Sequence, residues 1–213
     1  MHKKILLHPA VFPSLSHCAL MLEAEKIVFE INDHFEKQTY RNRYYIHGAH
    51  GKQMLSVPVR HGKSNTHRPT KDVEIANVFD WQRRHWKSLE TAYRTSPYFE
   101  FYEDDIKPLF EKSFDKLIDF NMETIRKVFE LLDWPIDYGF TNTYEKEPKD
   151  VADFRFLVNA KKEFAFKKQM PEYYQLFSDR NGFLPDLSIL DLLFMKGPET
   201  PVYLKEVVRL ITI

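Results

Sequence analysis

The sequence contains a single cysteine, Cys18, among 213 residues. One thiol cannot form a disulfide within the chain, and it cannot build a cysteine-rich zinc or iron–sulfur site. Cys18 precedes the apolar stretch Ala19–Leu22, so we expect a buried and unreactive thiol rather than a catalytic one. Such low cysteine usage is typical of a reducing compartment, and we expect a cytoplasmic protein.

The chain also lacks a net charge, because 31 Lys and Arg residues balance 31 Asp and Glu residues. A protein that follows nucleic acid by bulk positive charge is therefore disfavoured, and we expect no nucleic-acid partner. Long apolar runs are missing at the N-terminus. Ile5–Leu7 ends at His8 and Pro9, which is too short for a secretory h-region or a membrane span. We expect no membrane insertion.

Three glycine-dependent motifs are absent from the sequence. No Gly-x-Gly-x-x-Gly or Gly-x-Ser-x-Gly pattern occurs, which argues against a dinucleotide-binding turn and an α/β-hydrolase nucleophile elbow. Gly62-Lys63-Ser64 resembles the end of a P-loop, but Val57 occupies the position of the required upstream glycine. The sequence therefore leaves the cofactor unknown.

The residues that are present predict an α/β or α+β fold. Residues 5–7 and 26–31 have the composition of strands and flank helical residues at 15–24, so we expect two strands joined by a crossover helix. If these strands are parallel, the loop after the first lies at the carboxyl ends of the sheet, where α/β proteins bind ligands. Alternation at 39–46, followed by an apolar run at 53–59, predicts a hairpin. We expect an N-terminal mixed β-sheet.

A mainly helical middle and C-terminal part follows this sheet. Apolar residues take a helical period from Asp80 onward, Ser96-Pro97 predicts a new helix start with Phe101 facing inward, and Pro108 predicts a kink or restart. A short strand is expected at 141–144. We expect a single domain over residues 1–213, with a β-rich basic part (1–78), a helical part (79–135) and a mixed C-terminal part (136–213).

The charges are unevenly placed along this neutral chain. Residues 37–94 contain twelve Lys or Arg and four Asp or Glu, a local net charge of +8. Arg41 and Arg43 would point to the same face of a strand, where two guanidinium groups suit a phosphate or a carboxylate. The alternative interpretation is a solvated strand face that pairs with acidic helices elsewhere in the chain.

Histidines supply the candidate acid–base groups. His85 lies on an apolar helical stripe, where a hydrogen-bonded core histidine is the commoner outcome, although a shifted pKa would suit acid–base chemistry near neutral pH. His8, His17 and the pair Asp33-His34 would converge at one sheet edge if the first two strands are neighbours. Their spacing matches no strong metal signature, so we expect no metal.

Several blocks of sequence, taken in order, resemble the WbqC-like protein family. They are Pro9-Ala10-Val11-Phe12-Pro13, Lys37-Gln38-Thr39-Tyr40-Arg41-Asn42-Arg43, the helix of Trp81, Arg83, His85, Leu89 and Tyr93, Asn121 in a Phe-Asn pair, and Ser188-Ile189-Leu190-Asp191-Leu192-Leu193-Phe194 with Gly197-Pro198. His8, Ser16-His17 and Met195 depart from the family pattern. The resemblance implies a bacterial cytoplasmic protein encoded with O-antigen and other surface-polysaccharide genes.

These observations lead to an expected function and an expected site. We expect an enzyme of surface-glycan precursor biosynthesis, a transferase that binds a small anionic substrate such as a nucleotide-sugar or an acyl donor. The expected substrate-binding residues are Lys37, Arg41, Asn42, Arg43, Arg83, Trp86 and Tyr93, with His85 or His17 as acid or base. The alternative is a non-catalytic protein that docks an acidic partner through the same basic segment.

Overall fold

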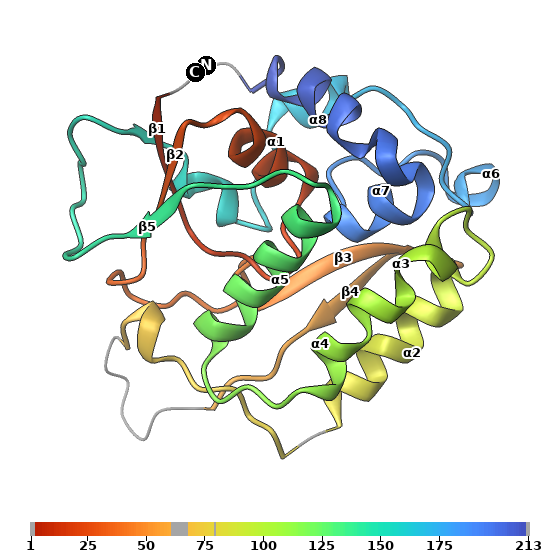
Figure 1. Ribbon diagram of the computed structural model, residues 1–213, viewed down its shortest axis with the longest axis horizontal. Helices are drawn as coiled ribbons and strands as arrows, with labels where there is room; N and C mark the ends of the chain where they lie inside the picture. Colours follow the sequence, from red (N-terminus) through yellow and green to blue (C-terminus); the bar gives the residue numbers. More distant parts are fainter. Residues whose placement is uncertain (1–2, 61–67, 79, 212–213) are drawn as a thin grey trace.

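The computed structural model describes residues 3–60, 68–78 and 80–211. The chain begins with β1 (Lys4–Leu7), α1 (Leu15–Glu23) and β2 (Lys26–Phe29). β1 and β2 pair in parallel, so the predicted strand, crossover helix and strand are confirmed. Two further parallel strands, β5 (Tyr138–Phe140) and β6 (Ala152–Asp153), flank this pair and give the order β5-β2-β1-β6. All carboxyl ends of this sheet therefore lie at one edge (Figure 1).

The predicted hairpin forms a second, antiparallel sheet of β3 (Arg43–Gly48) and β4 (Gly51–Ser56). Its register places Arg43 opposite Ser56 and Tyr45 opposite Met54. Side chains alternate along a strand, so Tyr44 and Ile46 enter the core while the Arg43 and Tyr45 side chains share the other face. The α/β class is confirmed, and its parallel and antiparallel strands lie in two separate sheets.

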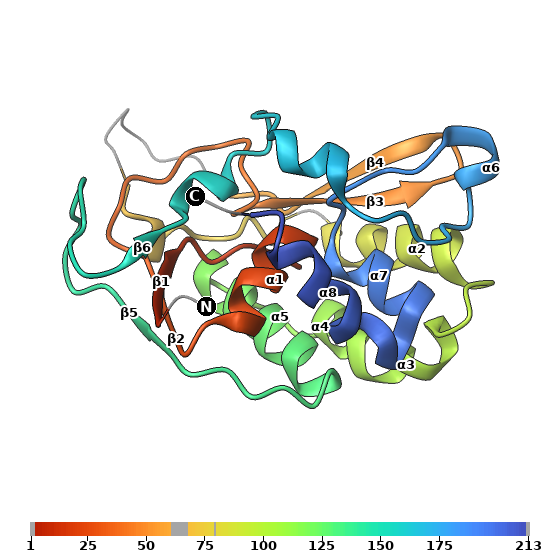
Figure 2. The same cartoon turned by 90° about the horizontal axis from the view of Figure 1, so that it is seen from above.

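The middle and C-terminal parts are mainly helical, as predicted. The helices are α2 (Trp81–Tyr93), α3 (Phe99–Ile106), α4 (Pro108–Glu111), α5 (Leu117–Leu131), α6 (Ser178–Asn181), α7 (Ile189–Lys196) and α8 (Thr200–Val208), with 3-10 turns at 70–72, 155–158, 165–169 and 197–199. Helices α2 and α7 pack against β3, on one side of the hairpin (Figure 2). Helix α4 begins at Pro108, which confirms the predicted restart.

Helix α7 shows how local sequence fixes its ends. The Ser188 side chain accepts a hydrogen bond from the Leu190 backbone N–H, as an N-cap should. Asp191 stands three residues later but points into the core instead of closing a capping box. Gly197 ends the helix with a φ of 51°, and an added Cβ there would lie 2.6 Å from the Tyr98 ring. Glycine is therefore required at this position.

Three local predictions are wrong. Helix α3 begins at Phe99, because the Tyr98 backbone N–H bonds to the Phe194 carbonyl and holds Ser96-Pro97 in a preceding turn. Phe101 is 70% exposed, because Phe99, Tyr102 and Ile106 form the buried face of α3 and Phe101 lies on the opposite face. The strand expected at 141–144 lies earlier, at 138–140, where its backbone matches the register of β2.

One continuous core joins both sheets and the helices. Phe12, from the loop after β1, is fully buried, and its ring contacts Tyr44, Phe110 and Phe120 at centroid distances of 5.2 to 6.1 Å. Cys18 is buried as well, and burial raises the pKa of its thiol well above the ordinary value. Within the ranges described above, no helix is long and apolar enough to cross a bilayer.

Candidate functional site

Charged and polar residues gather at the carboxyl edge of the parallel sheet. His8 follows β1, Glu30 follows β2, Thr141 follows β5 and Arg155 follows β6. The parallel pairing aligns these strand ends, which is why residues more than 100 positions apart meet there. Thr141 Oγ1 donates to Glu30 Oε1 over 2.9 Å. This edge is where α/β sheets most often carry their ligand sites.

A buried ion pair lies at the same edge. Arg41 is 2% exposed, and its Nη2 donates to Asp33 Oδ2 over 2.5 Å and to His8 Nε2 over 2.9 Å. The Thr70 hydroxyl donates to the other Asp33 oxygen over 2.6 Å. His8 and Asp33 thus converge, as the sequence suggested, whereas His34 is exposed and lies in a bridge with Pro69.

The guanidinium determines the protonation state of His8. Arginine only donates hydrogen bonds, so His8 Nε2 accepts and the ring proton lies on Nδ1, which faces the Glu30 carbonyl at 3.4 Å. Burial and the Arg41 charge lower the pKa of His8 well below its ordinary value. Burial also raises the pKa of Asp33, against the opposing charge of Arg41. His8 is therefore neutral at pH 7.

Arg155 closes the edge on the far side of β1. Its guanidinium forms a two-point contact with Asp153 at 2.9 and 2.7 Å and binds two backbone carbonyls of the 145–146 segment. Its Nη1 lies 3.6 Å from Glu30 Oε2, and Glu30 is fully buried. The charges at this edge are thus paired with one another, and the edge holds the surrounding loops in place.

A cleft of about 670 Å³ is lined in part by residues of the 37–43 segment, the segment whose Arg41 reaches the sheet edge. Its lining includes Lys37, Asn42 and Arg43 from the predicted site, together with Arg60. No acidic residue is among its described lining residues, and Val57, Pro58, Val59, Ala76 and Val78 form an apolar wall. Arg60 also forms an exposed ion pair with Glu74 at 3.3 Å. A cleft with several basic side chains and an apolar wall suits an anionic organic ligand.

Arg41 and Arg43 do not share a face, contrary to the sequence prediction. Strand β3 begins only at Arg43, and residues 39–42 form a turn in which the Thr39 hydroxyl bonds the Glu36 carbonyl. The turn sends the Arg41 side chain to Asp33 and leaves Arg43 at the cleft. Arg41 therefore anchors the segment that carries the cleft residues.

Four buried polar atoms of residues 37–43 have no hydrogen-bond partner among the described residues, namely Arg41 Nε, Arg41 Nη1, Asn42 Oδ1 and Arg43 Nε. Two of them, Asn42 Oδ1 and Arg43 Nε, belong to residues that line the cleft. The Asn42 amide nitrogen is held by the Val57 carbonyl at 3.2 Å, which fixes the direction of its oxygen. This acceptor and the Arg43 donor are therefore buried in the wall of the cleft.

His85 is a core residue with both ring nitrogens engaged. Its Nδ1 lies 3.2 Å from the Tyr44 hydroxyl, and its Nε2 lies 3.3 Å from the backbone carbonyl of Ser56, a residue that lines the cleft. Burial lowers the pKa of His85 to about 4. His85 is thus neutral at pH 7 and supports the cleft wall from behind.

The other predicted residues of α2 lie outside the cleft lining. Arg83 is on the surface and pairs with Asp80 at 3.6 Å. Trp86 is buried and stacks on Phe99. The Tyr93 hydroxyl donates to Asp191 over 2.6 Å inside the core. The structure therefore brings together Lys37, Asn42 and Arg43 and separates them from Arg83, Trp86 and Tyr93.

His17 ends a buried chain of hydrogen bonds. The Ser16 hydroxyl donates to Asp186, Ser14 lies 2.9 Å from Ser16, and His17 Nδ1 lies 3.1 Å from Ser14. Because the carboxylate only accepts, one consistent arrangement has His17 Nδ1–H donating to Ser14. His17 Nε2 is buried without a partner among the described residues, and burial lowers the pKa of His17 to about 4.

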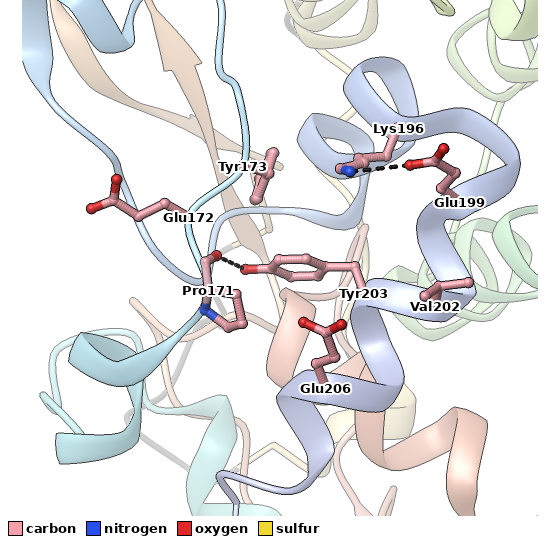
Figure 3. Close-up of a pocket in the computed structure, with 8 residues that line it drawn as sticks. All are labelled: Pro171, Glu172, Tyr173, Lys196, Glu199, Val202, Tyr203 and Glu206. Carbon is pink, nitrogen blue, oxygen red and sulfur yellow. Dashed lines mark hydrogen bonds and ion pairs between the residues drawn. The ribbon is translucent and has the colours of Figure 1, made fainter.

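A separate pocket of about 360 Å³ lies between α8 and the segment after residue 170 (Figure 3). The Tyr203 side chain crosses this pocket, and its hydroxyl donates to the Pro171 carbonyl over 2.7 Å. Three glutamates and one lysine supply its charges, namely Glu172, Glu199, Glu206 and Lys196. This pocket repels anions and contains no predicted site residue.

Sequence reasoning missed Arg60, Glu30 and Arg155. Arg60 lies after β4 within the basic segment, so its charge was visible while its place beside Lys37 was not. Glu30 and Arg155 are 125 positions apart, and only the sheet order brings them together. Across the described ranges, no group of three or more His, Cys, Asp or Glu side chains is arranged to hold a metal ion.

Comparison with known proteins gives one family and one curated relative. The family model of the WbqC-like protein family matches residues 8–163, which include the carboxyl edge and the whole cleft lining. The uncharacterized protein Rv1507c of Mycobacterium tuberculosis is 24% identical over 235 aligned positions, which cover 96% of this chain and 98% of that protein. No solved structure matches the chain.

Proposed function

This chain belongs to the WbqC-like protein family, and we propose that it is an enzyme of bacterial surface-polysaccharide precursor biosynthesis. In this proposal the chain binds an anionic substrate, such as a nucleotide-sugar or an acyl donor, in the basic cleft. Membership of the family supports the part of the proposal that concerns surface-polysaccharide biosynthesis. The basic residues of the cleft support the part that concerns an anionic substrate.

The observation that carries the proposal is the joint placement of Lys37, Arg43 and Arg60 in one cleft without an acidic lining residue. Arginine offers planar, two-point donation to phosphate or carboxylate oxygens, and lysine adds a flexible point charge. Asn42 Oδ1 adds an acceptor, which suits a sugar hydroxyl. Arg41 acts here as a positioning residue, because its pair with Asp33 fixes the turn that presents Asn42 and Arg43.

The acid–base step is assigned to His17 or His85 in this proposal. Both side chains are buried and neither lines the cleft, and they differ in that His17 Nε2 has no partner among the described residues while both nitrogens of His85 are engaged. A neutral imidazole with an available lone pair can accept a proton. His85 is proposed to position Ser56 at the cleft wall.

The test is a binding titration by calorimetry with UDP-glucose, a sugar 1-phosphate and acetyl-CoA. We expect one ligand class to bind the natural protein, and Arg43→Gln or Lys37→Gln to weaken that binding by about 10-fold to 100-fold, the range of a charged hydrogen bond. The matched control is Arg83→Gln, which removes an equal charge from the surface outside the cleft and should leave the affinity unchanged.

Two results would overturn the proposal. Equal weakening by Arg43→Gln and Arg83→Gln would show that bulk charge, not the cleft, attracts the ligand. Absence of binding by every ligand, together with salt-sensitive capture of an acidic protein, would favour the docking alternative, because exposed charges are screened more than a desolvated pocket.

A further inference from the structure

A second basic cavity, of about 320 Å³, lies between β4 and the 160–168 segment. Five lysines and one glutamate supply its charges, namely Lys52, Lys161, Lys162, Lys167, Lys168 and Glu163. None of these residues lines the cleft of Arg43. This lysine pocket therefore carries an excess of positive charge that the proposed function does not use.

Aromatic rings and one buried carboxylate hold two of these ammonium groups. Lys52 Nζ lies 4.3 Å from the centre of the Tyr45 ring. Lys167 Nζ lies 2.8 Å from Asp186 Oδ2, and the Phe164 ring centre is 5.5 Å away. These contacts give both lysines a defined position before any ligand arrives, which reduces the entropy lost on binding.

The lysines also act on one another. Burial against the pocket walls and the neighbouring charge of Lys167 lower the pKa of Lys52, in spite of the opposing charges of Asp186 and Glu163. Like charges repel, and an anion placed between them removes the repulsion. Asp186 already pairs with Lys167, but the other four lysines of the lining still outnumber its one glutamate, Glu163, which favours a negatively charged ligand.

We propose that the lysine pocket binds a phosphoryl-bearing small molecule, with its phosphate or diphosphate group between Lys52 and Lys167. Several lysine ammonium groups suit a phosphate, which has three or more oxygens and up to two charges, better than they suit a single planar carboxylate. Phe164, Leu184 and Pro185 form the apolar part of the lining and would contact the remainder of the ligand. The size of the pocket matches a small-molecule site.

The lysine pocket and the cleft share one face of the hairpin. Arg43 and Ser56, at one end of that face, line the cleft, while Lys52 lies opposite His47 near the other end and lines the lysine pocket. Tyr45 and Met54 lie between them on the same face. The proposal does not depend on the function of the cleft, because the two sets of lining residues are separate.

The experiment is a lysine-labelling footprint with inorganic pyrophosphate as the probe. The protein is labelled with a small acylating reagent at constant ionic strength, with pyrophosphate or chloride, and the labelled fraction of each lysine is measured by mass spectrometry. We expect pyrophosphate to reduce labelling of Lys52 and Lys161 at least threefold. The exposed Lys26 and Lys149, which lie outside both cavities, should be labelled equally in both conditions.

A variant pair then tests the affinity by calorimetry, in an Arg43→Gln background that disables the cleft. Lys52→Gln combined with Lys161→Gln and Lys168→Gln should weaken pyrophosphate binding at least tenfold. The control combines Lys4→Gln, Lys26→Gln and Lys149→Gln, three exposed lysines with the same total charge. Lys167 is left intact, because its loss would strand the buried Asp186 charge.

Three outcomes would overturn the proposal. These are equal protection of all lysines, equal weakening by the two triple variants, and the absence of binding in the Arg43→Gln background. A further labelling experiment uses phosphatidylglycerol vesicles in place of pyrophosphate. Protection of Lys52 by vesicles but not by pyrophosphate would identify a membrane-docking surface and also contradict the proposal.

Discussion

Replacing Arg41 by methionine tests whether the buried pair with Asp33 holds the site segment in place. The Arg41 side chain is 2% exposed and that of Asp33 is 10% exposed, so water replaces little of the lost interaction. Removing one partner of a buried pair costs about 3 to 5 kcal/mol, because a charge is left without its counter-ion. The Thr70 hydroxyl still donates to Asp33, which places the expected loss at the lower end of that range.

Thermal and urea unfolding measure this loss directly. For a chain of this length, each kcal/mol shifts Tm by about 2 to 4 °C, so a loss of about 3 kcal/mol in Arg41→Met should lower Tm by about 6 to 12 °C. The matched control is Arg60→Met, whose partner Glu74 lies at 3.3 Å in a pair with side-chain exposures of 60% and 45%. That exposed pair should contribute about 0 to 1 kcal/mol.

A second substitution separates charge from packing. In the Arg41→Met background, Asp33→Asn removes the stranded carboxylate and should recover part of the lost stability. The loss should also be smaller at pH 5 than at pH 7, since burial already raises the pKa of Asp33 and the missing guanidinium raises it further. Equal effects of Arg41→Met and Arg60→Met, or no recovery by Asp33→Asn, would refute the reasoning.

Two further predictions concern stability. His17 and His85 have pKa values of about 4 in the folded protein against 6.5 in the unfolded chain, so their contribution is complete above pH 6.5 and is lost as pH falls from 6.5 towards 4. The raised pKa of Asp191 changes stability with pH in the opposite sense, so the contribution of one histidine has to be isolated by substitution. The measurement is the pH slope of the free energy of urea unfolding, which should be shallower in His85→Asn than in the natural protein by up to about 1.4 kcal/mol per pH unit. An unchanged slope would contradict the lowered pKa of His85. Separately, Gly197→Ala should lower stability by about 2 to 4 kcal/mol because its Cβ meets the Tyr98 ring, whereas Gly139→Ala, which has open space around it, should change stability by less than about 1 kcal/mol in urea unfolding.

The sequence predicts elements well where a periodic pattern and a stop signal coincide. Helix α2 follows a clear apolar stripe, and α7 begins after Ser188 and ends at Gly197 as its residues indicate. It predicts less well where a backbone contact from elsewhere sets the boundary. The start of α3 depends on a hydrogen bond to Phe194, almost a hundred residues later, which no local pattern contains.

The site shows the same division between local and distant information. The basic charge of residues 37–94 is visible in the sequence, and three of the residues chosen from it lie in one cleft. The error at Arg41 arises because side-chain direction in a strand depends on where the strand begins, and a shift of one or two residues reverses or removes the alternation. Lys52 and Lys167 are 115 positions apart, so their common pocket required the fold.

Zero net charge does not prevent strong local fields in this protein. The cleft of Arg43 and the lysine pocket lie on one face of the hairpin and carry basic residues, while the pocket of Figure 3 gathers Glu172, Glu199 and Glu206 beside α8. Fields from such segregated charges reach about one Debye length, roughly 8 Å at physiological ionic strength, so the opposite sets do not cancel at the surface. An anion approaching the hairpin face therefore meets a basic surface, and its attraction is stronger than the zero net charge of the chain indicates.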